Sequence, residues 1–101
     1  MSYVHRLILE TIVNGLDAGM TPDQIASWLE GRMGAAGVTS SRALEAIEID
    51  WRIYTLRGEK IDGKPITATI IGQRVGRHRC EVFKAIRRHM VRRRAVLRVV
   101  A

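Results

Sequence analysis

Basic side chains crowd residues 77–92, in the last third of the chain. Guanidinium and ammonium groups bind phosphate oxygens, and an arginine can also form two parallel hydrogen bonds with the edge of a guanine. Residue types of this kind favour the binding of a polyanion over acid–base or nucleophilic chemistry. The candidate binding residues are Arg77, His78, Arg79, Lys84, Arg87, Arg88 and Arg92.

The net charge of +7 is divided unequally along the 101 residues. Residues 1–57 hold five arginines against seven acidic side chains, whereas residues 58–101 hold twelve lysines and arginines against three acidic side chains. A positive field concentrated in one part of a chain predicts docking of a polyanion there, most often a nucleic acid and less often an anionic membrane surface. The alternative is surface charge that serves only solubility.

Other kinds of site have little support in the sequence. The three histidines lie far apart, and none stands at metal-ligand spacing from a cysteine or a carboxylate. Cys80 is the only cysteine, and its arginine neighbours leave a redox-sensing role open beside that of an ordinary helix-start residue. The glycine-bearing residues 31–37 lack the lysine of a phosphate loop, and no nucleophile motif appears. We therefore expect no enzyme, no cofactor and no metal.

Length and composition indicate a small helical protein of the cytoplasm. The chain is long enough for one compact domain or for two helical subdomains that share a core. It does not begin like a signal peptide, and no apolar run approaches the roughly 20 residues that a membrane span needs. The predicted fold class is mainly all-α, with about five helices to which one short pair of strands can be added.

Residues 1–57 are predicted to form an N-terminal helical scaffold or dimerisation unit. Apolar residues recur at helical spacing over residues 3–16. Leu9 and Val13 widen this stripe beyond what one contact needs, so part of the helix is expected to face a second subunit.

The second predicted helix begins at Thr21-Pro22-Asp23-Gln24, which combines a hydroxyl cap, a proline and the glutamine of a capping box. It runs to about residue 30, with Ile25, Trp28 and Leu29 as its core face. Residues 31–37 are read as a linker.

A third helix is predicted from a cap at Thr39-Ser40-Ser41 to about residue 57, and it carries two opposed apolar stripes. Burial on two sides places this helix between the N-terminal helices and the basic C-terminal unit; a dimer seam on one stripe is the alternative. One stripe is Leu44, Ile47, Trp51 and Tyr54, and the other is Ala46, Ile49, Ile53 and Leu56.

Residues 58–65 have turn composition and are predicted to be a linker before a basic unit at residues 66–101. In that unit, residues 66–88 resemble a helix-turn-helix. Ile71 and Val75 suit the apolar anchors of a short first helix, and Gly72 suits a close crossing. Gly76 can adopt the positive φ of the tight turn.

The second helix of the motif, at about residues 79–92, carries the predicted contacts. Its expected core face is Val82, Phe83, Ile86 and Met90; this choice places Ile86 rather than Ala85 at the core and requires a turn that is one residue longer. The resemblance implies that this helix lies in the major groove of DNA. By role, base edges are assigned to Arg79, Lys84 and Arg88, and phosphates to Arg77, His78, Arg87 and Arg92.

The flanks extend the resemblance to the winged-helix superfamily. Residues 64–67 precede the first motif helix and residues 95–100 follow the second; both are read as strands that can pair with each other. Two features depart from the family. No Ser, Thr, Asp or Asn caps the second helix, and the chain ends before a second wing strand. A weaker helix-turn-helix echo lies in residues 19–57, whose acidic charge favours a packing or dimerisation role.

These features together predict a small transcription regulator of bacterial or phage type that binds double-stranded DNA as a dimer and can contact RNA polymerase or another regulator. Two alternatives remain: a nonspecific nucleic-acid-binding protein, and a protein-interaction module of the antiactivator type. RNA is disfavoured because Phe83, the only aromatic residue of the basic half, stands at a predicted core position.

Overall fold

The computed structural model describes the backbone of residues 3–37 and 39–100, and their side chains except at positions 36 and 97–100. This part of the chain is mainly helical, as predicted. Its elements are α1 (Tyr3–Asp17), α2 (Pro22–Met33), a 3-10 turn (Gly34–Gly37), α3 (Ser41–Leu56), β1 (Lys60–Ile61), β2 (Lys64–Pro65), α4 (Ala68–Val75) and α5 (Arg79–Val100).

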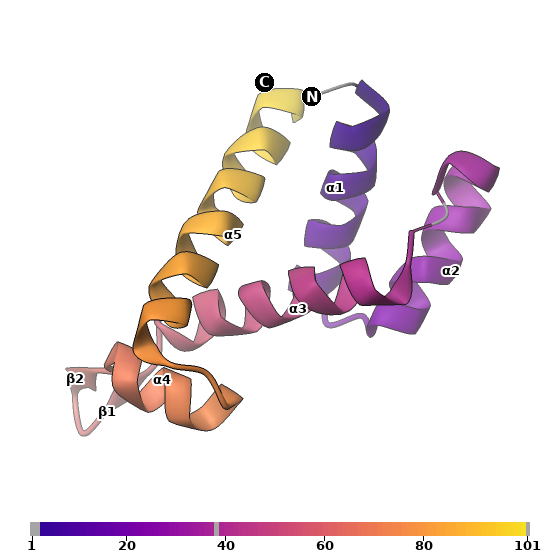
Figure 1. The fold of residues 1–101 in the computed structure, drawn as a ribbon. Helices are drawn as coiled ribbons and strands as arrows, with labels where there is room; N and C mark the ends of the chain where they lie inside the picture. Colours follow the sequence, from indigo (N-terminus) through magenta and orange to yellow (C-terminus); the bar gives the residue numbers. More distant parts are fainter. Residues whose placement is uncertain (1–2, 38, 101) are drawn as a thin grey trace.

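The helix α3 forms the centre of the arrangement (Figure 1). It crosses the ends of α1 and α5, with α2 packed near its beginning and α4 near its end. The long helix α5 runs back from the α4 end of the molecule to α1, so the first and last helices contact each other. The resulting body is elongated and measures 45 × 28 × 22 Å.

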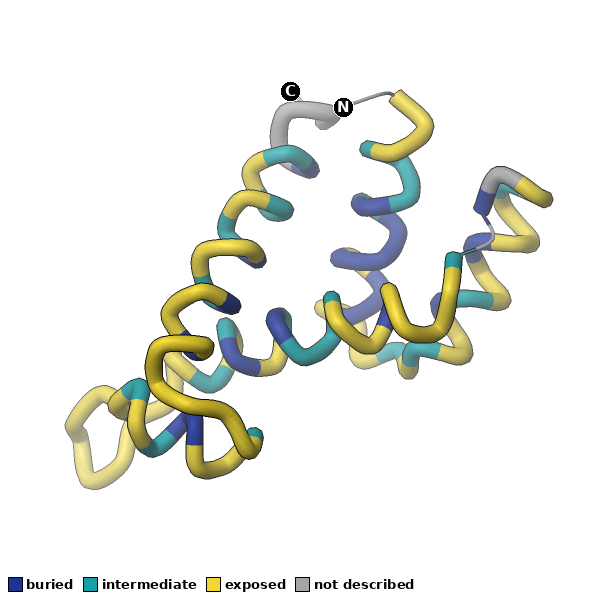
Figure 2. Tube along the Cα trace, in the orientation of Figure 1, coloured by how far each residue is buried: buried dark blue, intermediate teal, exposed yellow. Residues whose placement is uncertain are grey.

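Two clusters of buried side chains lie on the two stripes of α3, and buried turns face inward along each helix (Figure 2). Leu44 joins the first cluster and Ile53 the second, which confirms the prediction that α3 lies between the N-terminal helices and the basic unit. The first cluster is Ile12, Leu16, Ile25, Leu29 and Leu44. The second is Ile53, Ile66, Ile71, Val82 and Ala85.

Local capping explains where the helices begin. Thr21 and Gln24 form the predicted capping box, in which each side chain accepts a hydrogen bond from the backbone N–H of the other residue. Ser40 caps α3 by accepting from the N–H of Ala43, and Thr67 caps α4 by accepting from the N–H of Ile70. The predicted starts of α2 and α3 are thereby confirmed.

The wide apolar stripe of α1 is covered within the chain. Leu9 and Val13 pack against Val96 of α5, and Val13 is only 2% exposed. The width of this stripe therefore no longer indicates a second subunit, because α5 is long enough to return to α1 and cover these residues. Trp28 also differs from its predicted core position: it is 40% exposed, while Ile25 and Leu29 of the same helix are buried.

The predicted strand pair between residues 64–67 and 95–100 does not form. Instead β2 pairs with β1 in an antiparallel hairpin. The Asp62-Gly63 turn between the two strands has positive φ at both positions (52° and 77°), as a tight hairpin turn requires. Residues 95–100 continue α5. No glycine or proline interrupts α5, and Val96 is buried at helical spacing from His89, so packing against α1 outweighs the β-propensity of this segment.

Candidate nucleic-acid interface

The segment α4–turn–α5 has the connection expected from the sequence. Gly76 ends α4 in the left-handed conformation (φ 70°, ψ 36°), and its N–H donates to the carbonyl of Gly72. A Cβ at Gly72 would lie 2.3 Å from the carbonyl oxygen of Arg77, so this position has no room for a side chain. The predicted role of Gly76 is confirmed. Gly72 must also be small, but the reason is the close approach of the turn at Arg77 rather than the predicted crossing of the second helix.

His78 caps α5, which removes the apparent departure from a capped second helix. Its ring Nδ1 accepts a hydrogen bond from the N–H of Cys80 at 3.2 Å, and its carbonyl accepts from the N–H groups of Glu81 and Val82. Sequence reasoning missed this cap because it considered only hydroxyl and Asx side chains.

The buried face of α5 shares Val82 with the predicted face but is rotated toward Ala85 and His89. Val82, Ala85 and His89 are buried, whereas Phe83 is 59% exposed. The prediction that Phe83 is a core residue was wrong, and so was the longer turn that placed Ile86 rather than Ala85 at the core. The small side chain of Ala85 lies where α5 meets Ile53 of α3.

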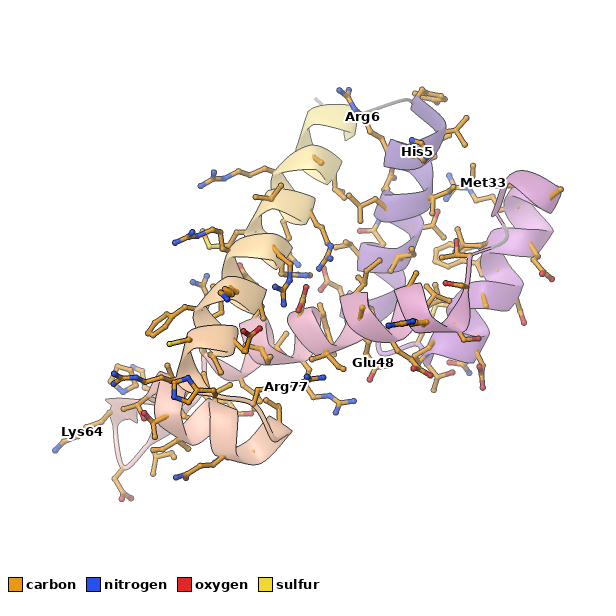
Figure 3. All side chains as sticks on the ribbon, in the orientation of Figure 1. His5, Arg6, Met33, Glu48, Lys64 and Arg77 are labelled. Atoms are coloured by element: carbon orange, nitrogen blue, oxygen red, sulfur yellow. The ribbon has the colours of Figure 1, made fainter. Side chains whose placement is uncertain are left out.

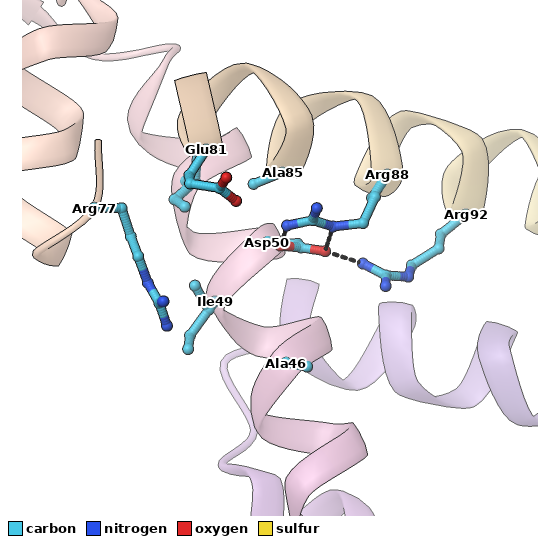
Figure 4. A pocket seen from close by; sticks show the side chains of 9 residues that line it. Ala46, Ile49, Asp50, Arg77, Glu81, Ala85, Arg88 and Arg92 are labelled. Atoms are coloured by element: carbon cyan, nitrogen blue, oxygen red, sulfur yellow. Dashed lines mark hydrogen bonds and ion pairs between the residues drawn. The ribbon is translucent and has the colours of Figure 1, made fainter. Parts of the chain in front are cut away.

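This rotation brings Arg88 and Arg92 toward α3, where both bind Asp50 (Figure 4). Arg88 donates to the two carboxylate oxygens at 2.9 and 3.0 Å, and Arg92 donates at 2.6 Å. Asp50 is 3% exposed. Burial by itself raises the pKa of its carboxyl, but the hydrogen bonds and charges of the two arginines outweigh burial and hold the pKa below its ordinary value.

A second acidic residue, Asp17 at the end of α1, joins three helices. It accepts hydrogen bonds from the indole Nε1 of Trp51 at 2.9 Å and from Arg93 at 3.2 Å. Sequence reasoning counted Asp17 and Asp50 only as net charge. The one available signal was the position of Asp50 between the two apolar stripes of α3.

His89 is fully buried where α5 crosses Tyr54 of α3, with ring centroids 4.8 Å apart. Neither ring nitrogen has a hydrogen-bond partner among the described residues. Burial, together with the charges of Arg93 and Arg92, lowers the pKa of His89 to about 4, while Asp17 and Asp50 act in the opposite direction. The imidazole is therefore neutral at pH 7.

The side of α5 turned away from the other helices is called here the outward face. At its beginning, Lys84 and Arg87 are exposed, and Lys84 makes only a surface ion pair with Glu81 at 3.3 Å. Arg79 is exposed in the first turn beside this face. The residues of the outward face are Cys80, Phe83, Lys84, Arg87, Val91 and Arg94.

The seven residues predicted to contact DNA fall into two groups in the structure. Five of them are exposed at the turn and the start of α5: Arg77, His78, Arg79, Lys84 and Arg87. The other two, Arg88 and Arg92, serve the ion cluster with Asp50.

A half-open pocket of about 300 Å³ separates the start of α5 from α3. The ion cluster of Asp50 lines one part of it, and Arg77 extends beside Ile49 in another (Figure 4). Figure 3 shows Lys64 projecting outward from the end of the molecule that carries α4 and the hairpin, whereas Arg77 lies on the side of α4 next to α3.

Two other kinds of feature are not found in the described part of the chain. No three His, Cys, Asp or Glu side chains there gather into a group that could hold a metal ion. No described helix combines the length and the apolar character that a membrane crossing requires.

Comparison of the chain with protein families, with curated proteins and with solved structures found no match in any of the three.

Proposed function

We propose that this protein binds double-stranded DNA through α4, the turn at Gly76 and α5, with the first turns of α5 in the major groove. The observation that carries the proposal is the exposed basic start of α5, where Arg79, Lys84 and Arg87 stand directly after a tight turn between two packed helices.

The physical fit supports the proposal in two ways. The major groove is about 12 Å wide and admits one α-helix, whose N-terminal residues then approach base edges. Arginine and lysine at these positions can bind guanine, and cations beside them neutralise phosphates, which provides most of the affinity. Arg77 and His78 are exposed in the turn directly before α5, and they are the proposed phosphate contacts.

The role of Arg88 changes within this proposal. Its predicted base contact has weaker support, because its Nε and one Nη already donate to Asp50. Arg87, the preceding residue, is the better candidate for a base contact, since it lies on the outward face.

The biological role that follows is regulation of transcription, of bacterial or phage type, in the cytoplasm where such DNA lies. A two-fold operator would require a homodimer. The packing of Leu9 and Val13 against α5 removes one argument for that dimer, so its contact surface would lie elsewhere.

The test is a salt titration of affinity for random duplex and for genomic fragments from the protein's own locus, with three variants. Arg87→Ala should weaken specific binding by about tenfold or more, which corresponds to about 1–3 kcal/mol, without changing thermal stability. Arg42→Ala, an exposed change in the acidic half, should have no effect on binding. Arg88→Ala should lower the free energy of unfolding by about 1–2 kcal/mol, because Asp50 loses two hydrogen bonds.

Three outcomes separate the possible functions. Preference for one fragment by about 10³ with a steep negative salt slope supports a specific regulator. Equal affinity for every duplex points to a nonspecific nucleic-acid binder. Absence of DNA binding at low salt contradicts the proposal and favours the protein-interaction module.

A further inference from the structure

Two large apolar side chains on the outward face of α5 are more than half exposed. Phe83 is 59% exposed and Val91 is 57% exposed, while Val82, the neighbour of Phe83, is fully buried. Single exposed apolar side chains are common on protein surfaces. Phe83 differs from the others because it stands among exposed cations at the start of the helix that the proposed function places in the major groove.

The position of Phe83 separates it from Val91. Phe83 is the fifth residue of α5, close to the turn, whereas Val91 lies eight residues further along, a distance of about 12 Å at 1.5 Å per residue. A helix that inserts its N-terminal turns into the major groove would therefore bring Phe83 to the base edges and leave Val91 near the rim of the groove.

The neighbours of Phe83 define the chemistry of its partner. Arg79 and Arg87 lie one helical turn before and after it, and Lys84 follows it directly; all three are exposed cations. A partner that covers the ring must therefore also satisfy a positive surface. An acidic polymer with an apolar group in reach meets both requirements.

We propose that Phe83 packs against the 5-methyl group of a thymine in the major groove, so that the preferred DNA site carries a thymine beside the base pair contacted by Arg87. This inference rests on the proposed function. Thymine is the one base that presents an apolar group in the major groove, and a phenylalanine ring can discriminate it without hydrogen bonds.

The experiment uses the preferred duplex, selected by the full-length protein from a random-sequence pool, and replaces each thymine in turn with deoxyuridine. This replacement removes only the methyl group. One position should weaken wild-type binding by about fourfold, which is the value of about 0.8 kcal/mol for a buried methylene group converted at 1.4 kcal/mol per factor of ten.

Two variants with similarly exposed side chains complete the test. Phe83→Ala should bind the thymine and deoxyuridine duplexes equally, and should bind the thymine duplex several-fold more weakly than the wild type does. Val91→Ala should keep the full sensitivity to deoxyuridine. Because both side chains are exposed, both variants should keep the wild-type thermal stability.

Each outcome decides one point. Sensitivity to deoxyuridine that is lost in Phe83→Ala and kept in Val91→Ala supports the contact. Specific binding in which the wild type and Phe83→Ala respond alike to every deoxyuridine overturns the inference and leaves the proposed function standing. Failure of the protein to bind any duplex overturns both.

The exposure of Phe83 also bears on RNA, which was disfavoured because this residue was expected in the core. That argument no longer holds. The same pool prepared as single-stranded RNA serves as a comparison, and tighter binding to it than to duplex DNA would contradict the thymine contact.

Discussion

Arg88 and Arg92 have the side-chain type expected of a DNA contact, but both bind Asp50 within the protein. Isolated burial of the Asp50 carboxylate would cost several kcal/mol, and the two guanidinium groups offset this cost with three hydrogen bonds. The side chain of Arg88 remains half exposed. Its main contact is nevertheless within the protein, between α3 and α5.

His89 predicts a pH dependence of stability. Its pKa is about 4 in the folded protein, against 6.5 for the unperturbed side chain, so the unfolded chain binds the proton more tightly. Stability is therefore complete above pH 6.5 and falls as the pH decreases from 6.5 to 4. The largest loss that this shift allows is about 3 kcal/mol. Chemical denaturation across this pH range measures it.

The substitution His89→Phe should remove most of that slope. It should also leave stability at pH 7.5 unchanged or raised, because the two buried nitrogens have no hydrogen-bond partner among the described residues. The control is His78→Asn, an exposed position where asparagine can keep the cap of α5 and the slope should persist. A slope that is unchanged in His89→Phe would assign the pH dependence to other groups.

At the scale of elements, the orientation of α5 depends on small residues. Gly72 lets the turn pass close to α4, and Ala85 lets α5 lie against Ile53 of α3. Together they determine which side chains of α5 face α3 and which face outward. The side chains exposed at the start of α5 consequently depend on packing against α4 and α3.

Gly72→Ala should therefore destabilise the protein by about 2 kcal/mol or more, because the new Cβ would lie 2.3 Å from the Arg77 carbonyl oxygen and the backbone must move. DNA affinity should fall as the start of α5 shifts. The matched control is Gly31→Ala in α2, where nothing lies within 4 Å and φ is ordinary. That change should be neutral or stabilising by up to about 1 kcal/mol. Thermal denaturation of both variants gives the comparison, and equal stability of the two would contradict this account of the turn.

At the scale of the whole molecule, α5 connects the two ends of the fold. Its beginning packs with α4 and its later part with α1, while α3 contributes to a cluster on each side. The basic start of α5 is thus held on a frame that includes the acidic N-terminal helices. A substitution that weakens the contact between α1 and α5 is therefore expected to lower the stability of α4, at the opposite end of the molecule.

Val13→Ala tests this connection. Val13 is 2% exposed against α5, and its truncation should cost about 1–3 kcal/mol. Hydrogen exchange should show loss of protection in α4 as well as in α1. Val4→Ala, at an exposed position of the same helix, should change little. Full protection of α4 in Val13→Ala would mean that the two ends unfold independently.

The sequence by itself determined the presence of the five helices, the caps of α2 and α3, and the tight turn at Gly76. These features depend on neighbours along the chain: the capping box of Thr21 and Gln24, and the positive φ of Gly76, follow from local geometry. It also located the two stripes of α3 and the basic character of the last third, since periodicity and charge are properties of the chain alone.

Only the tertiary structure decided how α5 is rotated and where its later part lies. Phe83 is the larger apolar side chain, so the sequence favours it over Ala85 for the core. The close approach of α5 to α3 nevertheless requires the smaller side chain, and Ala85 is the buried residue. Residues 95–100 have the composition of a strand but continue a helix, because Leu9 and Val13 of α1 offer Val96 an apolar surface at helical spacing. Contacts between residues far apart in the chain outweighed local preference at both places.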